Sequence, residues 1–293
     1  MTRSRSEAIG MAALRGLASL CFALLLASYA FAGEAGAPEG DLLGEALRAE
    51  GVDPSVAALV ISRLEDEKTW THGGDRVGRR FSPASTAKIP HTLLAVEVGA
   101  VSGMQDVFAW DGEVRFIDSW NQDQTFAQAF QRSAVWVYQI VVARIGAERL
   151  TAGFAAFGYG NGEIGGPEEI TSYWLAAPLA ISAAEQVAFL SRLARRTLPL
   201  SGRTYDLALP AMVLARGEGW VMYGKTGWKS AVAGDRSDLG WFVGWVEQAE
   251  GAAPGTYVFA LNMDMPGGMA EAPKRRAAVE RALQSIGALG PQP

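Results

Sequence analysis

The chain has 293 residues, of which 49% are hydrophobic and 19% are charged, so it can bury a large core in one sizeable domain or two closely packed ones. Its formal net charge at pH 7 is −5, and removal of residues 1–32, which hold three basic residues and one acidic residue, leaves 23 basic against 30 acidic residues, a net charge of −7. This acidic balance argues against nucleic acid or an anionic membrane surface as a partner.

Residues 1–32 have the pattern of a secretory signal peptide. Arg3 and Arg5 precede an apolar run over 16–27, and the sequence AFAG at 30–33 offers small residues at the two positions that a signal peptidase reads. The apolar run is shorter than the roughly 20 residues that a membrane span requires, so a cleaved signal is favoured over a transmembrane anchor. The sequence therefore predicts export of the chain.

The segment after this signal is a short linker over 33–41, rich in glycine, proline and acidic residues, and one folded domain is predicted over 42–290. Cys21 is the only cysteine of the chain and lies inside the signal. The exported protein would therefore have neither a thiol nor a disulfide.

The first predicted elements are a hairpin and a helix. The β-branched run SVAALVISRLED at 55–66 turns through EDEK into TWTHGGD, which is typical of a strand hairpin. Residues 85–98 follow Pro83 and have apolar residues at helical spacing, so they predict a helix with Pro90 in its first turns.

The middle of the chain, residues 125–215, is predicted to be rich in helices. TFAQAFQRS, AVWVYQIVVARIG and AERLTAGFAAFG are helical patterns, the last two ending at Gly146 and Gly158. SAAEQVAFLSRLARR begins at Ser182 and has Glu185 three residues later, which is the pattern of a capping box.

The last third of the chain changes to strands. GWVMYGKTGW, GWFVGWVE and TYVFALNM are short, aromatic or β-branched runs, and a helix is expected over 271–288. Strands at both ends of the domain with helices between them predict an α+β fold, in which helices cover an antiparallel sheet and a helical subdomain lies to one side.

The stretch FSPASTAKIP at 81–90 contains the first candidate catalytic residues, Ser85 and Lys88. Only five of the 26 basic residues are lysines, so a lysine in this apolar setting is notable, because lysine can lose its proton on burial whereas arginine cannot. On a helix the amine lies one turn from the hydroxyl and can reach it. The structural alternatives are a helix N-cap for Ser85 and an exposed helical lysine for Lys88.

Other catalytic systems find little support in the sequence. His72 and His91 are the only histidines and neither has a serine motif nearby, so each is expected to be a satisfied or exposed histidine, and a Ser-His-Asp triad is not supported. With two histidines and no cysteine after residue 32, a zinc hydrolase also lacks ligands, and no metal is expected.

Four further short motifs follow the serine motif along the chain. STAK at 85–88 is followed in order by SAV at 133–135, YGN at 159–161, SYWL at 172–175 and KTGW at 225–228. Together these motifs resemble the class D, or oxacillinase-type, serine β-lactamases, over nearly the whole chain after the linker. The resemblance implies a β-lactamase/transpeptidase-like catalytic domain over 42–290, in the periplasm, that hydrolyses β-lactam antibiotics and so gives resistance.

The resemblance implies a role for each motif residue. Ser85 would be the nucleophile, Lys88 the base and Ser133 a proton carrier toward the β-lactam nitrogen, and Lys225, also assigned to the catalytic group, would begin the strand that flanks the substrate. The backbone N–H groups of Ser85 and Trp228 would form the oxyanion hole. A helix N-cap is the structural alternative for Ser133.

Substrate binding and site shape are assigned to a second group of residues by the same resemblance. Thr226 and Arg275 would bind the substrate carboxylate, with Arg276 as a rival for Arg275. Gly227 would let the strand approach the substrate. Tyr159 and Asn161 are expected to shape the site.

The resemblance further implies that Lys88 takes up carbon dioxide, supplied by bicarbonate, and becomes N6-carboxylysine. Apolar walls such as Val135 would favour the neutral amine that reacts, and the indole N–H of Trp174 would support the anionic product. Core packing is the structural alternative for Trp174. No organic cofactor is expected, and the partners are small β-lactams.

Two departures from the family pattern lie next to the base. Ala87 replaces a bulky aromatic residue and His91 replaces the usual asparagine, which leaves the packing around Lys88 and the substrate range open. The competing functions are a penicillin-sensing receptor domain, which usually has a polar residue at the position of Val135, and a penicillin-binding transpeptidase or carboxypeptidase, which more often has S-x-N at 133–135. The sequence does not indicate an oligomeric state.

Overall fold

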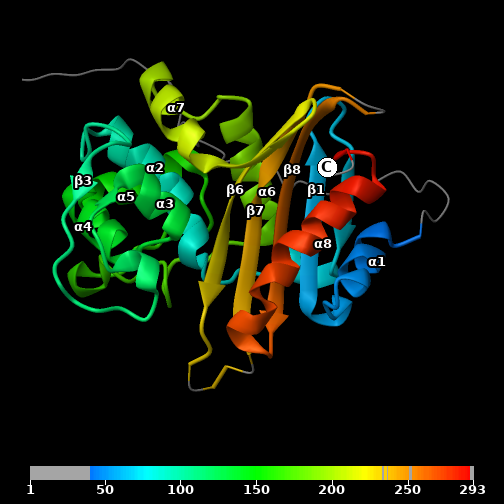
Figure 1. Ribbon diagram of the computed structural model, residues 1–293, viewed down its shortest axis with the longest axis horizontal. Coiled ribbons are helices and arrows are strands. Elements are labelled where there is room, and N and C mark those ends of the chain that lie inside the picture. Colours follow the sequence, from blue (N-terminus) through cyan, green and yellow to red (C-terminus); the bar gives the residue numbers. More distant parts are fainter. Residues whose placement is uncertain (1–39, 233, 236, 251–252, 291–293) are drawn as a thin grey trace, which may run out of the picture. The chain divides into compact units, whose positions relative to one another are not determined.

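The computed structural model describes residues 40–232, 234–235, 237–250 and 253–290 (Figure 1). The predicted signal peptide and most of the predicted linker lie outside the described residues. A six-stranded sheet with every neighbouring pair antiparallel forms the centre of the described domain, in the order β2-β1-β8-β7-β6-β5. Its strands are β1 (Ala57–Arg63), β2 (Thr69–His72), β5 (Val213–Gly217), β6 (Trp220–Lys229), β7 (Asp238–Gln248) and β8 (Gly255–Met265).

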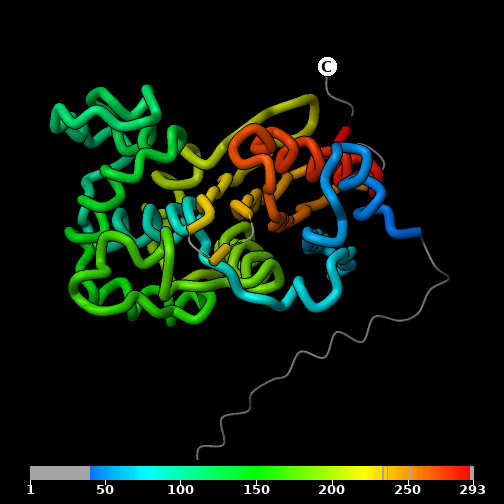
Figure 2. The backbone as a smooth tube through the Cα atoms, turned by 90° about the horizontal axis from the view of Figure 1, so that it is seen from below, coloured from blue at the N-terminus to red at the C-terminus, as the bar shows by residue number. Residues whose placement is uncertain are grey.

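Both faces of the sheet are covered by helices, which explains why its central strands are almost continuously apolar. On β1, Ala58 and Val60 belong to one core while Leu59 and Ile61 belong to the other, because successive side chains of a strand point to opposite faces. Helix α6 (Ala183–Ala194) packs on the first face. Helices α1 (Leu42–Ala49) and α8 (Ala272–Ser285) pack on the second, so the start of the described chain lies beside its end (Figure 2).

The other helices group beside the sheet and pack mainly on one another (Figure 1). They are α2 (Lys88–Glu97), α3 (Phe126–Arg132), α4 (Val135–Ile145), α5 (Ala147–Phe157) and α7 (Gly202–Ala208), with a two-stranded sheet of β3 (Val107–Phe108) and β4 (Gln124–Thr125). This arrangement confirms the predicted α+β fold with a helical subdomain.

The predicted hairpin, the helix of residues 85–98 and the capping box are all present, with one difference in the helix. Residues 84–87 form a 3-10 turn, and the α-helix begins only at Lys88. Pro90 lies in the first turn of this helix, where a missing N–H costs little. Ser182 accepts a hydrogen bond from the backbone of Glu185, whose carboxylate accepts one from the backbone of Ser182.

The sequence analysis did not identify β5 or α7. The edge strand β5 has five residues and a register shift between Val213 and Ala215, so its pattern does not alternate cleanly. Helix α7 has seven residues and begins with a glycine, which is too short for a helical period to stand out. In the part of the chain that the structure describes, no helix has the length and apolar character to cross a bilayer.

Loss of the capping box is expected to weaken the helix that covers the first face of the sheet. Ser182→Ala should lower the free energy of unfolding by about 1 kcal/mol, the usual value of an N-cap hydrogen bond, in urea denaturation. Ser191→Ala in the same helix is the control, because its hydroxyl only donates back to the Val187 carbonyl. If the two substitutions lower the free energy of unfolding equally, the cap contributes no more than the hydroxyl of Ser191.

Candidate active site

A cavity of about 580 Å³ lies where β6 and the helical subdomain meet. Predicted site residues form much of its wall: Ser85, Ser133, Val135, Thr226, Gly227, Trp228 and Arg275. Lys88 and Lys225 are buried, with 0% and 3% of their surfaces exposed. The structure therefore brings the hydroxyls and the two lysines of the predicted site together.

Ser85 lies on the 3-10 turn Ala84–Ala87, directly before helix α2, and one turn of chain separates it from Lys88. The amine Nζ of Lys88 donates a hydrogen bond to Oγ of Ser85 over 2.9 Å. Burial, and then the nearby charge of Lys225, hold the pKa of Lys88 well below its usual value. A lowered pKa favours the neutral amine, whose lone pair can act as a base or as a nucleophile.

Ser133 and Lys225 form the second polar pair of the site. Nζ of Lys225 donates to Oγ of Ser133 over 2.5 Å and to the Thr226 carbonyl over 3.1 Å. Burial, and then the charge of Arg275, lower the pKa of Lys225 to about 7. Near neutral pH this lysine can therefore exchange a proton with the hydroxyl that it contacts.

The N-cap alternative for Ser133 is wrong. Ser133 ends helix α3 in a left-handed conformation with φ 61°, and Ala134 is the residue that precedes helix α4. A non-glycine residue in this conformation is uncommon. The backbone here turns sharply between two helices, and the serine lies in the cavity wall beside Lys225.

Gly227 allows strand β6 to lie directly against the turn of the serine. A Cβ atom at this position would be 3.0 Å from the Pro83 carbonyl oxygen and 3.1 Å from Cγ2 of Thr86. β5 pairs with β6 only as far as Tyr223, so the later residues of β6 border the cavity on that edge. The sequence analysis expected this glycine to let the strand approach the substrate, and the structure adds a close approach to the turn of Ser85.

Arg275 lies in the cavity wall, whereas Arg276 does not. The guanidinium of Arg275 donates to the carbonyls of Gly227 and Ala272, and burial lowers its pKa to about 10. Arg276 is instead paired with Glu280 one turn along α8, at 2.5 Å. Of the two arginines that the sequence left as rivals, Arg275 is the one that a ligand in the cavity can reach.

Trp174 is fully buried in the same core cluster as apolar residues of the Lys88 helix, and the fully buried ring of His91 packs against it. The indole Nε1 of Trp174 has no hydrogen-bond partner among the described residues. Nε2 of His91 lies 2.7 Å from the Tyr173 hydroxyl, but its Nδ1 has no partner among them. The expectation of a satisfied or exposed histidine is thus wrong for Nδ1 of His91. It is right for His72, whose ring nitrogens contact Asp41 and the Pro54 carbonyl.

Tyr159, Asn161 and Ala87 lie behind the cavity wall. The side chain of Asn161 donates to the Pro178 carbonyl and accepts from the backbone of Ala180. Gln186 links the hydroxyl of Tyr159 to that of Thr86, beside Ser85. Ala87 is fully buried in the core. These three residues do not line the cavity, so they can influence the site only through the residues that they contact.

An apolar rim of the cavity was missed by the sequence analysis. It consists of Phe116, Ile117, Trp120, Leu175, Val232 and Met269, together with Trp228. The ring of Phe116 is 75% exposed and meets those of Trp120 and Trp228 edge to face, at 5.6 and 6.2 Å. Residues 109–123 have no regular period, so only this exposed aromatic residue could have drawn attention to them.

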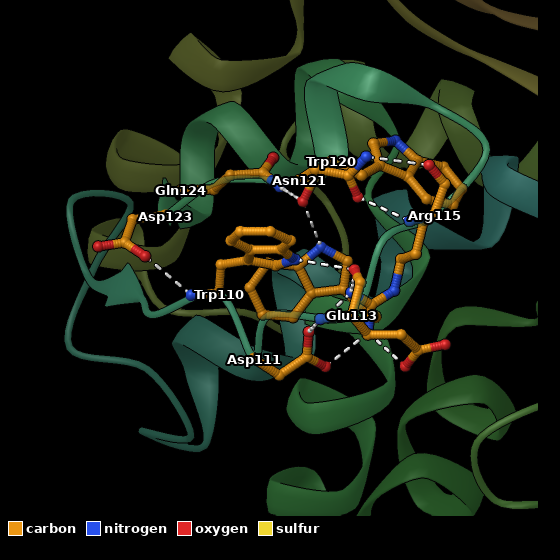
Figure 3. A network of polar contacts seen from close by, with 9 residues as sticks. Trp110, Asp111, Glu113, Arg115, Trp120, Asn121, Asp123 and Gln124 are labelled. Carbon is orange, nitrogen blue, oxygen red and sulfur yellow. Dashed lines mark hydrogen bonds and ion pairs between the residues drawn. The ribbon is translucent and has the colours of Figure 1, made fainter.

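The loop that presents Phe116 is held by a network of polar contacts (Figure 3). The guanidinium of Arg115 donates to both carboxylate oxygens of Asp111, at 2.9 and 2.6 Å. The side chain of Asn121 accepts from the backbone N–H of Arg115 and donates to its carbonyl. The indole of Trp110 donates to the Glu113 carbonyl. The backbone directly before Phe116 is therefore fixed by contacts within the loop.

The comparisons with known proteins agree with one another. The family model described as Penicillin binding protein transpeptidase domain matches residues 56–284. Beta-lactamase OXA-2 of Salmonella typhimurium is 37% identical over 276 residues, which cover 93% of this chain and 95% of that protein. Beta-lactamase OXA-48 of Klebsiella pneumoniae is 35% identical over 212 residues, covering 72% and 77%.

Solved structures are similar over most of the chain. The class D β-lactamase YbXI from Nostoc has a TM-score of 0.78 and 38% identity, and the match covers 84% of this chain and 99% of that one. The class D β-lactamase FUS-1 (OXA-85) from Fusobacterium nucleatum subsp. polymorphum has a TM-score of 0.78 and 32% identity, with 86% and 100% covered.

The polar network of the rim loop is expected to hold that loop in place. In Arg115→Ala the ion pair with Asp111 is lost, so the backbone amides of residues 110–123 should exchange with deuterium faster than in the parent protein. Arg196→Ala, which removes an exposed ion pair with Asp206, is the control and should leave this loop unchanged. Unchanged exchange in Arg115→Ala would mean that the other contacts of the loop hold it without this ion pair.

Proposed function

The chain belongs to the class D β-lactamases, which are serine hydrolases, and we propose that it hydrolyses β-lactam antibiotics through an acyl-enzyme on Ser85 and thereby gives resistance to them. One observation carries this proposal: the hydroxyl of Ser85 is hydrogen-bonded to the amine of a lysine that is buried and depressed in pKa. A serine hydroxyl needs such a base, because it is a weak nucleophile while it keeps its proton.

Lys88 is the base in this proposal, after it has taken up carbon dioxide. The lone pair of the neutral amine forms a bond to the carbon, one C=O pair moves onto oxygen, and one amine proton leaves to water. Two features of this chain fit the product: burial lowers the pKa of the amine, which favours the neutral form that the reaction requires, and the buried indole N–H of Trp174 has no partner among the described residues. A buried anion needs such a donor.

Acylation then uses the groups around the cavity. Oγ of Ser85 gives its proton to the base and attacks the lactam carbonyl, and the lactam C–N bond breaks as the ring opens. The N–H groups of Ser85 and Trp228 stabilise the developing oxyanion. Ser133 passes a proton to the departing nitrogen, and Lys225 replaces that proton through their contact of 2.5 Å.

The substrate carboxylate is bound by Thr226 and Arg275. Both line the cavity, and the charge of Arg275 has no carboxylate partner among the described residues, because its guanidinium donates only to backbone carbonyls. An anionic substrate would supply that partner. Water, activated by the Lys88 base, then releases the acyl group from Ser85.

The competing functions differ in this last step. A penicillin sensor and a penicillin-binding transpeptidase both form an acyl-enzyme with β-lactams, but neither releases it rapidly. The apolar Val135 in the cavity wall, where a polar residue is expected in these proteins, favours hydrolysis.

Export to the periplasm is part of the proposal and rests on the sequence of residues 1–32 alone, with cleavage after Ala32. N-terminal sequencing of the exported protein should begin at Gly33. An N-terminus upstream of the apolar run would contradict a cleaved signal.

Ser85→Ala is expected to abolish covalent labelling by penicillin, because no other described hydroxyl of the cavity contacts Lys88. Mass spectrometry of the intact protein after mixing with the drug measures the adduct. The control is Ser133→Ala, which should still be acylated, at a lower rate. An adduct on the Ser85→Ala protein would show that another residue is the nucleophile.

Trp174→Phe is expected to slow deacylation more than acylation. Removal of a hydrogen bond to a buried anion raises its free energy by about 1.5 to 3 kcal/mol, which shifts carboxylation of Lys88 by about ten- to a hundredfold. Stopped-flow kinetics should show a burst followed by a low steady rate that partly recovers in high bicarbonate. Trp245→Phe, a buried tryptophan of the sheet, is the control. If Trp174→Phe turns over at the parental steady-state rate without added bicarbonate, Trp174 serves only to pack the core.

A further inference from the structure

Two nitrogens without a partner among the described residues belong to contacting rings in the core. Nε1 of Trp174 and Nδ1 of His91 are both buried and have no partner among the described residues. Their rings meet edge to face, with centroids 5.0 Å apart and an interplanar angle of 77°. Because buried polar groups are nearly always paired, two such atoms on contacting rings indicate a place that receives a polar group.

His91 is held firmly and without charge. Its ring lies among those of Tyr138, Phe154, Tyr173 and Trp174, with centroids 5.0 to 6.3 Å away. Burial is the main cause that holds its pKa well below the usual value. The neutral imidazole therefore has one N–H and one lone pair, and the Tyr173 hydroxyl contacts only Nε2.

His91 also lies next to the base along the chain. It is three residues after Lys88 on helix α2, so both side chains project from one face in adjacent turns. Neither side chain is exposed to solvent. A polar group attached to the amine of Lys88 would thus be added beside the imidazole, in a region where bulk water cannot solvate it.

We propose that His91 is a positioning residue for the carboxylated Lys88, with Nδ1–H as a second hydrogen-bond donor beside the indole of Trp174, and that Tyr173 sets the tautomer. The carbamate has two oxygens, so two donors can be satisfied at once. This inference rests on the proposed carboxylation of Lys88 and names the residues that make it favourable in this chain.

The role of Tyr173 follows from the proton count of the imidazole. If the Tyr173 hydroxyl donates to Nε2, the single ring proton is on Nδ1, which is then a donor. In the opposite arrangement Nδ1 has a lone pair, which would repel an anion. Formation of the carbamate therefore selects the arrangement in which the tyrosine is the donor, as an outer partner fixes the tautomer of many functional histidines.

Titration with ¹³C-labelled bicarbonate tests the proposal on the purified exported protein, with the carbamate carbon observed by NMR. His91→Phe keeps an aromatic ring but has no donor, so the half-saturating bicarbonate concentration should rise about tenfold, the usual effect of one lost hydrogen bond to an anion. His91→Asn keeps a donor and should stay within about twofold. Tyr173→Phe should raise the concentration as His91→Phe does, and the double variant should add little to either.

His72→Asn is the matched control, because it changes the other histidine, which contacts Asp41 at 2.9 Å and the Pro54 carbonyl. It should leave the titration unchanged. A parental half-saturating concentration in folded His91→Phe would overturn the proposal, and if that variant does not fold, the same result in Tyr173→Phe would do so.

The parent protein separates this proposal from the hydrolase proposal. If the parent takes up no label, both the carbamate and the role of His91 are overturned, whereas acylation of Ser85 by penicillin remains a separate test of the nucleophile. Uptake of label without any acyl adduct would leave the role of His91 intact and overturn the acyl-enzyme.

Discussion

The burial of the Lys88 amine is the constraint on which the rest of the site depends. A charged ammonium in this position would have neither water nor, within the described residues, a carboxylate partner, so the neutral form is favoured. The helix that contains Lys88 packs against other helices of the subdomain, and its amine still reaches Ser85 at the cavity. Burial thus turns an ordinary cation into a base within hydrogen-bonding distance of a hydroxyl.

The second requirement is that the sheet and the helical subdomain meet closely at this point. The 3-10 turn of Ser85 contacts β6, β7 and α2, and Gly227 lets the strand lie against it. Lys225 on β6 reaches Ser133, at the end of α3, across the same junction. The polar groups of the site therefore come from separate elements. The packing of these elements in the core of the domain holds each group in place.

Much of this arrangement could be predicted from the sequence because the motifs are local. Ser85 and Lys88 are one turn apart, so any helical conformation brings them together. The expected fold also agrees with the structure. The short aromatic or β-branched runs that predicted the strands and the capping box of α6 each lie within a short segment of sequence.

What could not be predicted depends on contacts between distant segments. The family resemblance favoured Arg275 but left Arg276 as a rival, because only the direction of each side chain from α8 decides which one reaches the cavity. Phe116 lies in a loop without periodicity, and its place on the rim depends on the polar network around Arg115 (Figure 3). The departure at His91 was visible in the sequence, but its partners were not, because its contacts with Tyr173 and Trp174 join segments that are about 80 residues apart.

The measurement that tests the central claim most directly is turnover of a chromogenic β-lactam by purified protein, degassed and then supplied with bicarbonate, at neutral and at acidic pH. If burial keeps Lys88 neutral for carboxylation, steady turnover should fall on degassing and return reversibly with bicarbonate. It should also weaken as the pH falls, because acid returns the amine to ammonium. Turnover that is indifferent to bicarbonate and unchanged at about pH 5 would contradict the account and indicate a plain lysine base.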